Sequence, residues 1–187
     1  MDIAFNLDDH LPIETSRFIL RKLTLDDAGD IFTYGSDPEM SRFVPWDYAK
    51  SVDDIVVFIE GALRKYREGG PFDLAIVGRE QGRVIGALGY NHWDPVNHWA
   101  EMGYAVARAW WGRGVTVEAA TALLGLGFGP MGLHRVEAMC MLENARSERV
   151  MQKLGMAFEC VKRGRMYANG AHHDGKMYYM LNPALLK

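Results

Sequence analysis

Two glycines, Gly112 and Gly114, are the residues whose spacing most clearly suggests chemistry. They follow an apolar run at residues 99–107 and precede a helix-forming run at residues 115–128. Glycine lets the backbone approach a ligand closely. The free N–H groups and the dipole of a helix start favour phosphate oxygens. The spacing predicts a strand–turn–helix site for a phosphate-bearing anion, although a tight turn without a ligand would have the same spacing.

Two common phosphate motifs do not fit this turn. A dinucleotide fingerprint needs Gly-x-Gly-x-x-Gly, and its third glycine position holds Val117. A P-loop ends in Gly-Lys-Ser or Gly-Lys-Thr, which is absent here. A second glycine-rich stretch, residues 125–129, falls at the end of the same predicted helix, where helix termination explains it.

Cysteine and histidine do not form a convincing metal site. Cys140 and Cys160 belong to no Cys-x-x-Cys pair or metal-spaced cluster, and the apolar surroundings of Cys140 predict a buried free thiol. His172, His173 and Asp174 are adjacent, and neighbouring residues of a strand point to opposite faces. We therefore expect no metal.

The elements that must position the turn follow from periodicity and from capping and turn signals. The predicted strands span residues 17–23, 72–77, 84–90, 99–107 and 135–142, with two more flanking Asn169 and Gly170. The predicted helices start at Thr24, Ser51, Gly114 and Asn144. The order β α α β β β α β α β β predicts an α/β (α+β) fold, a mixed sheet with helices around it.

The whole chain reads as one domain over residues 1–187, with no repeat or linker. Its net charge of −3 argues against a broad nucleic-acid-binding face. The acidic start, residues 1–11, is not a signal peptide. No run of about 18 apolar residues predicts a membrane span. We expect a cytoplasmic protein that has no nucleic-acid or membrane partner.

Residues 100–119 resemble motif A of the GNAT acetyltransferases, and more closely that of the RimJ/RimL branch, which acetylates protein N-termini and related amines. The branch pattern Ala-Glu-hydrophobic-Gly-Tyr is matched by residues 100–104, and Trp-Gly-x-Gly-x-Ala-x-Glu-Ala by residues 111–119. The similarity covers nearly the whole chain. It also includes residues 14–21, 144–147, 150–155, 169–170 and Asp174.

The resemblance implies a GNAT fold, with a central mixed and mostly antiparallel sheet, and acetyl-CoA as co-substrate. The cofactor-binding residues that it implies are Tyr104, Ala105, Val106, Trp111, Gly112, Arg113, Gly114, Val115, Thr116 and Asn144. Thr116 departs from the family, which prefers Gly or Ala there. Its branched side chain narrows the room beside the pyrophosphate, or its hydroxyl donates to a phosphate oxygen.

The implied reaction is direct attack of a neutral amine on the thioester, and Glu101 is the candidate base. Glu101, Gly103 and Ala105 share one face of their strand, which suggests a lined groove. Neutralising an α-amine at pH 7 costs roughly 1 kcal/mol, against roughly 4.6 kcal/mol for a lysine. One carboxylate acting through water suits the neutralisation of an α-amine better than that of a lysine. The alternative is that Glu101 pairs with an arginine or fixes a loop.

Ser147 is the candidate acid, since the branch places a serine near the CoA sulfur three residues after a helix-starting Asn. Tyr104 and Tyr167 compete for that role. Asn144 also reads simply as a helix N-cap, with Ser147 in the first turn. Backbone N–H groups near Val106 are expected to polarise the carbonyl, as the family pattern implies.

The branch implies a protein N-terminal α-amine, of the ribosomal-protein type, as acceptor. Two alternatives remain open. One is transfer to a small amine, such as an antibiotic, a polyamine or an amino acid, and the other is a non-catalytic acyl-CoA-binding module. Residues 43–46 lie where the branch shapes its substrate site. Branch members often form dimers, so a homodimer is a further expectation.

Overall fold

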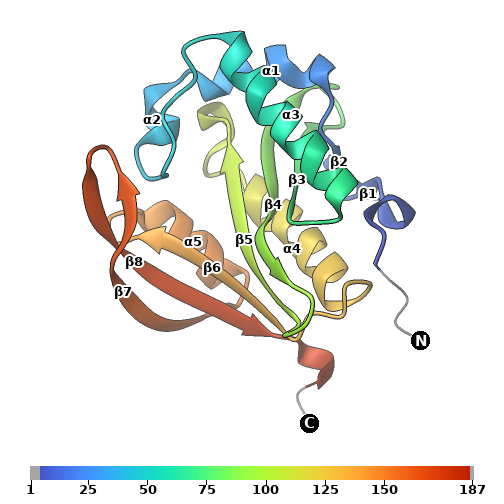
Figure 1. Cartoon of the computed structure of the whole chain (residues 1–187), viewed down its shortest axis with the longest axis vertical. Coiled ribbons are helices and arrows are strands. Elements are labelled where there is room, and N and C mark those ends of the chain that lie inside the picture. The colour runs from blue at the N-terminus through green and yellow to red at the C-terminus, as the bar shows by residue number, and fades with distance from the viewer. Residues whose placement is uncertain (1–4, 186–187) are drawn as a thin grey trace.

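Eight strands form the sheet at the centre of residues 5–185, the part of the chain that the computed structural model describes (Figure 1). Neighbouring strands follow the order β1-β2-β3-β4-β5-β6-β8-β7, and only β5 and β6 are parallel. The strands are β1 (Ile13–Glu14), β2 (Phe18–Lys22), β3 (Phe72–Gly78), β4 (Val84–Asp94), β5 (Trp99–Val106), β6 (Arg135–Met141), β7 (Ala157–Ala168) and β8 (Ala171–Leu181). The expected mixed, mostly antiparallel sheet is confirmed.

Helices cover both faces of this sheet. Figure 1 shows α3 in front of the sheet and α4 and α5 behind it. The helices are α1 (Ala28–Gly35), α2 (Pro38–Ser41), α3 (Val52–Glu68), α4 (Val115–Phe128) and α5 (Ala145–Lys153), and short 3₁₀ turns span Leu7–His10, Leu25–Asp27, Arg108–Trp110 and Pro183–Leu185. None of the helices within residues 5–185 is long and apolar enough to cross a membrane.

The observed element order contains every predicted element and two short additions, β1 and α2. The one-turn helix α2 forms between the first two predicted helices, at Asp37 and Pro38. The Asp37 side chain accepts a hydrogen bond from the Glu39 N–H, and Pro38 occupies the first helical position, which suits proline.

The first helix also starts later than Thr24. Thr24 and Asp27 form a capping box, but it caps a 3₁₀ turn, Leu25–Asp27, and α1 begins only at Ala28. The Asp27 carboxylate accepts from the Thr24 N–H at 2.8 Å and from the Arg21 guanidinium at 2.7 and 2.8 Å. The charged pair with Arg21 therefore ties this first turn to β2.

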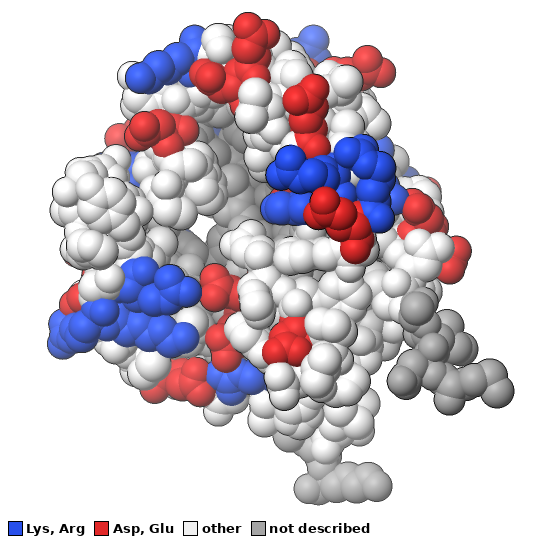
Figure 2. All heavy atoms as spheres, in the orientation of Figure 1, with Lys and Arg blue, Asp and Glu red and all other residues white. Residues whose placement is uncertain are grey.

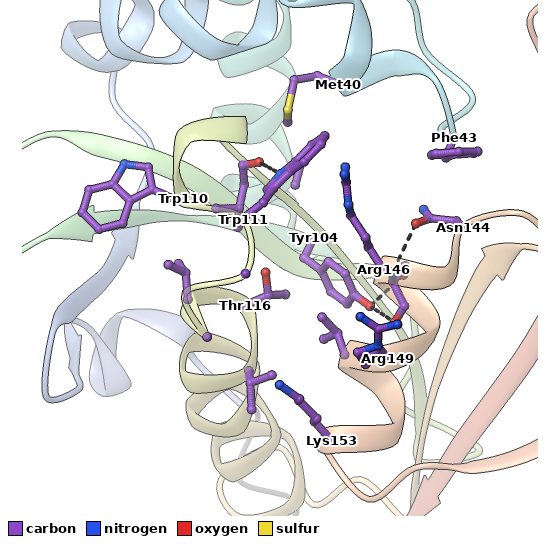
Figure 3. Close-up of a pocket in the computed structure, with 18 of the residues that line it drawn as sticks. Met40, Phe43, Tyr104, Trp110, Trp111, Thr116, Asn144, Arg146, Arg149 and Lys153 are labelled. Atoms are coloured by element: carbon purple, nitrogen blue, oxygen red, sulfur yellow. Dashed lines mark hydrogen bonds between the residues drawn. The ribbon is translucent and has the colours of Figure 1, made fainter.

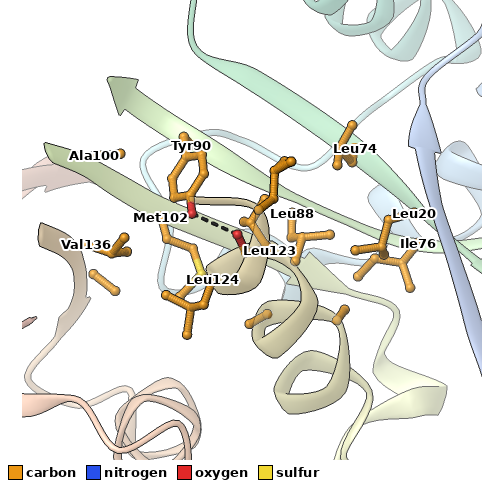
Figure 4. Close-up of a cluster of buried hydrophobic side chains, with 14 of the residues drawn as sticks. Leu20, Leu74, Ile76, Leu88, Tyr90, Ala100, Met102, Leu123, Leu124 and Val136 are labelled. Atoms are coloured by element: carbon orange, nitrogen blue, oxygen red, sulfur yellow. Dashed lines mark hydrogen bonds between the residues drawn. The ribbon is translucent and has the colours of Figure 1, made fainter. Parts of the chain in front are cut away.

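The larger of the two apolar cores lies between the sheet and α4 (Figure 4). At its centre the buried Tyr90 hydroxyl donates to the Leu123 carbonyl at 3.0 Å. A Cβ on Gly127 would lie 2.1 Å from that hydroxyl oxygen. Helix termination therefore explains Gly129, which follows the last residue of α4, but Gly127 lies inside α4 and makes room for Tyr90.

The seam between β5 and β6 positions the site. The two strands pair only over residues 99–101 and 135–137 and then diverge (Figure 1). From Met102 to Val106, the β5 edge that faces β6 has no strand beside it. Such an edge presents backbone N–H and C=O groups to any extended chain that enters the gap.

Candidate active site

A cavity of about 300 Å³ lies among α2, the turn after β5, the start of α4, and α5 (Figure 3). Ten of the twelve residues that the sequence put forward for catalysis or cofactor binding line it. They are Tyr104, Ala105, Val106, Trp111, Gly112, Gly114, Val115, Thr116, Asn144 and Ser147. The structure thus brings together residues that are more than 40 positions apart in the sequence.

The other two, Glu101 and Arg113, do not line this cavity. Glu101 is the last β5 residue paired with β6, beside Glu137, and alternation along the strand places it on the opposite face from Tyr104. The Arg113 guanidinium lies 5.5 Å from the Trp110 ring, and the Arg113 carbonyl accepts a hydrogen bond from Arg17 at 3.0 Å. Arg113 thus contacts its neighbours instead of the cavity.

The glycine turn has the backbone that its sequence requires. Gly112 and Gly114 have φ values of 74° and 76°, in the left-handed region that glycine adopts most readily. Gly114 is the N-cap of α4, and no side chain caps this helix start. The first N–H groups of α4 are therefore available to an anion, and the helix dipole favours negative charge there.

Glu118 fastens the start of the chain to α4. Its carboxylate accepts from the Arg17 N–H at 2.8 Å, the Arg17 Nε at 2.7 Å and the Thr15 hydroxyl at 2.8 Å. Burial raises the pKa of Glu118, these hydrogen bonds lower it, and the net shift is downward. Glu118 is engaged with the segment before β2, so its charge does not cap the helix start that lines the cavity.

Trp111 connects the turn to both sides of the cavity. Its indole Nε1 donates to the Val106 carbonyl at 2.6 Å, which holds the turn against the end of β5. The Arg146 guanidinium, from α5, lies 4.4 Å from the Trp111 ring centre. A cation–π contact therefore joins the turn to α5 across the cavity.

Three cations of α5 were missed from the sequence. Arg146, Arg149 and Lys153 line the cavity and make no salt bridge to a carboxylate within the described part of the chain. Their spacing of three and four residues puts them on one side of a helix. That spacing, next to the candidate Ser147, was the signal in the sequence that could have identified these cations as part of the site. Their unpaired charges make this part of the cavity favourable for phosphate.

Two hydroxyl groups meet at the inner end, where α5 faces β5. Tyr104 Oη lies 2.8 Å from Ser147 Oγ and 3.2 Å from the Ser147 carbonyl oxygen. Asn144 caps α5 by accepting from the Ser147 N–H at 3.1 Å. Burial raises the pKa of Tyr104, and the hydrogen bond with Ser147 opposes that shift only in part. The Tyr104 phenol is therefore protonated at neutral pH.

Cys140 on β6 is buried, as its apolar surroundings predicted. Burial raises the pKa of its thiol to about 11. The thiolate is the reactive form of cysteine, so Cys140 is a poor nucleophile at neutral pH.

The opposite side of the cavity is formed by α2 and the loop after it. Met40, Phe43 and Val44 give this side an apolar surface, and Glu39 is the one carboxylate among the described residues that line the cavity. Asp37 at the start of α2 pairs with Arg108, just after β5, at 2.7 Å. This ion pair holds α2 beside the end of β5.

The turn between β7 and β8 also contacts the α2 segment. Asn169 Nδ2 donates to the Arg42 carbonyl at 3.2 Å. Figure 2 shows the molecule hollowed between the β7–β8 hairpin and the middle of the sheet. Access to the split between β5 and β6 from this face is therefore bounded by α2 on one side and the hairpin on another.

Comparisons with known proteins agree with this geometry. A family model described as an acetyltransferase (GNAT) domain matches residues 17–157. The chain is 30% identical over 171 residues to YoaA of Bacillus subtilis, an uncharacterised N-acetyltransferase, and this match covers 91% of the chain and 97% of YoaA. It is 25% identical over 132 residues to the ribosomal-protein-serine acetyltransferase of Escherichia coli, covering 70% of the chain and 72% of that protein.

A solved structure with the same fold is RimL, a ribosomal L7/L12 α-N-protein acetyltransferase in complex with coenzyme A. The TM-score is 0.81 at 20% identity, and the match covers 91% of this chain and 97% of that one. The family model and YoaA each cover well over half of the chain. The chain therefore belongs to the GNAT family of acetyltransferases, in which its relatives are N-acetyltransferases that include RimJ/RimL-like enzymes.

Proposed function

We propose that this cavity holds acetyl-CoA and that the chain transfers the acetyl group to a primary amine, specifically a protein N-terminal α-amine. The observation that carries the proposal is the chemical polarity of one cavity. An uncapped helix start and three cations with no carboxylate partner among residues 5–185 line it, and two half-buried hydroxyl groups lie where β5 separates from β6. A cofactor with phosphates at one end and a thioester at the other fits that arrangement.

The outer part of the cavity supplies the phosphate-binding groups. The N–H groups of Val115 and Thr116, at the start of α4, would bind the pyrophosphate. Arg149 and Lys153 extend from α5 toward the same space and would neutralise phosphate charge (Figure 3). Because these cations have no carboxylate partner among residues 5–185, binding phosphate breaks no ion pair of theirs.

The inner part would hold the extended arm of the cofactor. The free edge of β5 beyond Glu101 offers backbone groups to amides of the arm, as a neighbouring strand would. An arm that follows this edge from the glycine turn passes Val106 and reaches the Tyr104–Ser147 pair. The thioester would therefore lie beside Ser147 Oγ.

The chain would assist the reaction in three ways. A neutral amine attacks the thioester carbon, the new C–N bond forms, and the C–S bond breaks. Glu101, on the face of β5 away from Tyr104, would accept the amine's proton through water. Backbone N–H groups near Val106 would polarise the carbonyl. The Ser147 hydroxyl would donate a hydrogen bond to the departing sulfur.

Two features favour an α-amine acceptor. An α-amine is neutralised at pH 7 for roughly 1 kcal/mol and a lysine for roughly 4.6 kcal/mol, so one water-relayed carboxylate suits an α-amine better than a lysine. The acceptor side is also bounded by separate segments, α2 and the β7–β8 hairpin, that leave a hollow between them (Figure 2). The names of the E. coli and RimL relatives, which describe ribosomal proteins as substrates, support the same acceptor class.

The test is a mass-spectrometric assay with acetyl-CoA and three kinds of acceptor. These are peptides with a free N-terminus and no lysine, N-terminally blocked peptides with one lysine, and a polyamine. The proposal predicts acetylation of the free N-terminus at the highest kcat/KM. Preference for the blocked lysine peptide or the polyamine would overturn the assigned acceptor. Binding of CoA without transfer to any amine would favour the non-catalytic binding module.

A further inference from the structure

Tyr104 is a half-buried tyrosine beside the proposed thioester position, and the proposed reaction assigns no role to its hydroxyl. It lies on β5 and points across the seam toward α5 (Figure 3). Its Oη atom lies 2.8 Å from Ser147 Oγ and 3.2 Å from the Ser147 carbonyl oxygen. Its only hydrogen-bond contacts among the described residues are to Ser147.

The phenol has one proton and two acceptors within reach. If Tyr104 donates to the carbonyl oxygen, Ser147 Oγ can donate to Tyr104 Oη, and the serine proton is then held by Tyr104. If Tyr104 donates to Ser147 Oγ, the serine proton is free for another acceptor. Both arrangements use the 2.8 Å contact, and only the second leaves the serine proton for a sulfur acceptor in the cavity, so a leaving thiolate there would select it.

Acid strength excludes full proton transfer along this pair. Burial raises the pKa of Tyr104, so the phenol holds its proton at neutral pH. A serine hydroxyl is a much weaker acid than a thiol, whose pKa is about 8.5 in cysteine. Ser147 therefore keeps its proton and stabilises the leaving thiolate as a hydrogen-bond donor.

We propose that Tyr104 is a positioning residue: its hydroxyl donates to Ser147 Oγ and so directs the Ser147 proton at the sulfur of the leaving thiolate. The inference rests on the proposed acetyl transfer. As the C–N bond forms, the electron pair of the C–S bond passes to sulfur, which accepts the hydrogen bond from Ser147. The proton of the attacking amine passes through water to Glu101, and the thiolate later takes a proton from water.

A double-mutant cycle with Tyr104→Phe and Ser147→Ala tests this role. Tyr104→Phe should lower kcat about tenfold and leave KM for acetyl-CoA unchanged, because the lost hydrogen bond acts on the leaving group. The same substitution in the Ser147→Ala background should change kcat less than twofold. A merely structural role would lower kcat equally in both backgrounds and would overturn the inference.

Tyr90→Phe is the matched control. Tyr90 lies on the neighbouring strand β4. The substitution removes a single buried hydroxyl, which donates a hydrogen bond to the Leu123 carbonyl in the core. It should change the melting temperature but not kcat. Tyr104→Met repeats the hydroxyl deletion with a flexible side chain, and melting curves confirm that each variant is folded at the assay temperature.

The outcomes separate this inference from the proposed function. If the wild type transfers acetyl groups and Tyr104→Phe and Tyr104→Met retain its kcat, the positioning role is wrong and the acetyltransferase proposal stands. If the wild type transfers to no amine, both are wrong.

Discussion

At the scale of single residues, two kinds of group line the cavity: charged side chains and hydroxyl groups. Cations line the part nearest α5, and the Tyr104–Ser147 pair lies at the seam of the sheet. The two kinds of group can be tested separately, because the cations should determine cofactor affinity and the hydroxyl groups should determine turnover.

Removing two of the α5 cations, in Arg149→Ala/Lys153→Ala, should weaken acetyl-CoA binding about tenfold, or about 1.4 kcal/mol. The loss should shrink at high salt, since screening weakens exposed charges. Isothermal titration calorimetry at two salt concentrations measures both effects. Arg64→Ala/Arg83→Ala, which removes the same charge outside the cavity, should bind like the wild type. Equal affinity in both double variants would exclude these cations from the cofactor site.

The carboxylate that receives the amine's proton is testable through pH. Glu101→Gln should lower kcat/KM at least tenfold at pH 7, where most of an α-amine is protonated. The loss should diminish above about pH 8, because the acceptor is then neutral without help. Steady-state rates from pH 6 to about 9.5 measure the profile. If Glu39→Gln shows this profile and Glu101→Gln does not, the proton acceptor is Glu39, the carboxylate that lines the cavity.

At the scale of elements, the glycine turn joins β5 to α4 and can be tested separately from helix stability. Gly114→Ala should lower acetyl-CoA affinity and cost about 1 kcal/mol in stability, because the residue has φ of 76°. Gly125→Ala, in open space within α4, should raise stability by about 0.5–1 kcal/mol and leave affinity unchanged. Calorimetry and urea unfolding measure both. Unchanged affinity in Gly114→Ala would contradict a cofactor role for the turn.

The sequence predicted these elements well where a local signal exists. Gly114 and the regular apolar spacing of α3 predict their elements because backbone conformation and burial depend on nearby residues. The prediction of helix termination was wrong for Gly127. A glycine is needed there because the Tyr90 hydroxyl leaves no room for a Cβ, and Tyr90 lies 37 positions earlier in the chain, outside any local sequence pattern. The divergence of β5 from β6 has no local signature at all.

The site shows the same limit. Ten of the predicted residues line the cavity because motif positions transfer from the family to this chain. Arg149 and Lys153 were missed because their role depends on which face of α5 meets the cavity. The Tyr104–Ser147 contact joins a residue of β5 to a residue of α5 that lies 43 positions later in the chain. Only the three-dimensional fold brings the two side chains together.

At the scale of the whole molecule, the pair Arg21–Asp27 predicts how stability depends on pH. Burial raises the pKa of Asp27, bonds from Arg21 and Thr24 lower it, and the net shift is downward. A carboxylate whose folded pKa is lowered contributes stability above its ordinary pKa, and this is lost as pH falls through the folded value. Asp27→Asn should therefore cost about 1–3 kcal/mol at neutral pH and progressively less below about pH 4.

Urea unfolding of the wild type and Asp27→Asn from about pH 7 to about pH 3 measures this dependence. Asp53→Asn, which changes an exposed acidic residue of α3, is the control and should differ little from the wild type. We also propose that residues 1–187 act as one domain, which a single cooperative transition would support. A difference between Asp27→Asn and the wild type that grows on acidification would contradict the assigned sign.

The most direct test of the central claim is a single-turnover experiment with acetyl-CoA labelled in its acetyl group and an α-amine peptide in excess. Direct transfer within the cavity predicts that the label moves from CoA to the peptide N-terminus, with matched release of CoA thiol and no labelled protein at any time. Label that accumulates on the protein, or that stays on CoA while the peptide is unchanged, would contradict it.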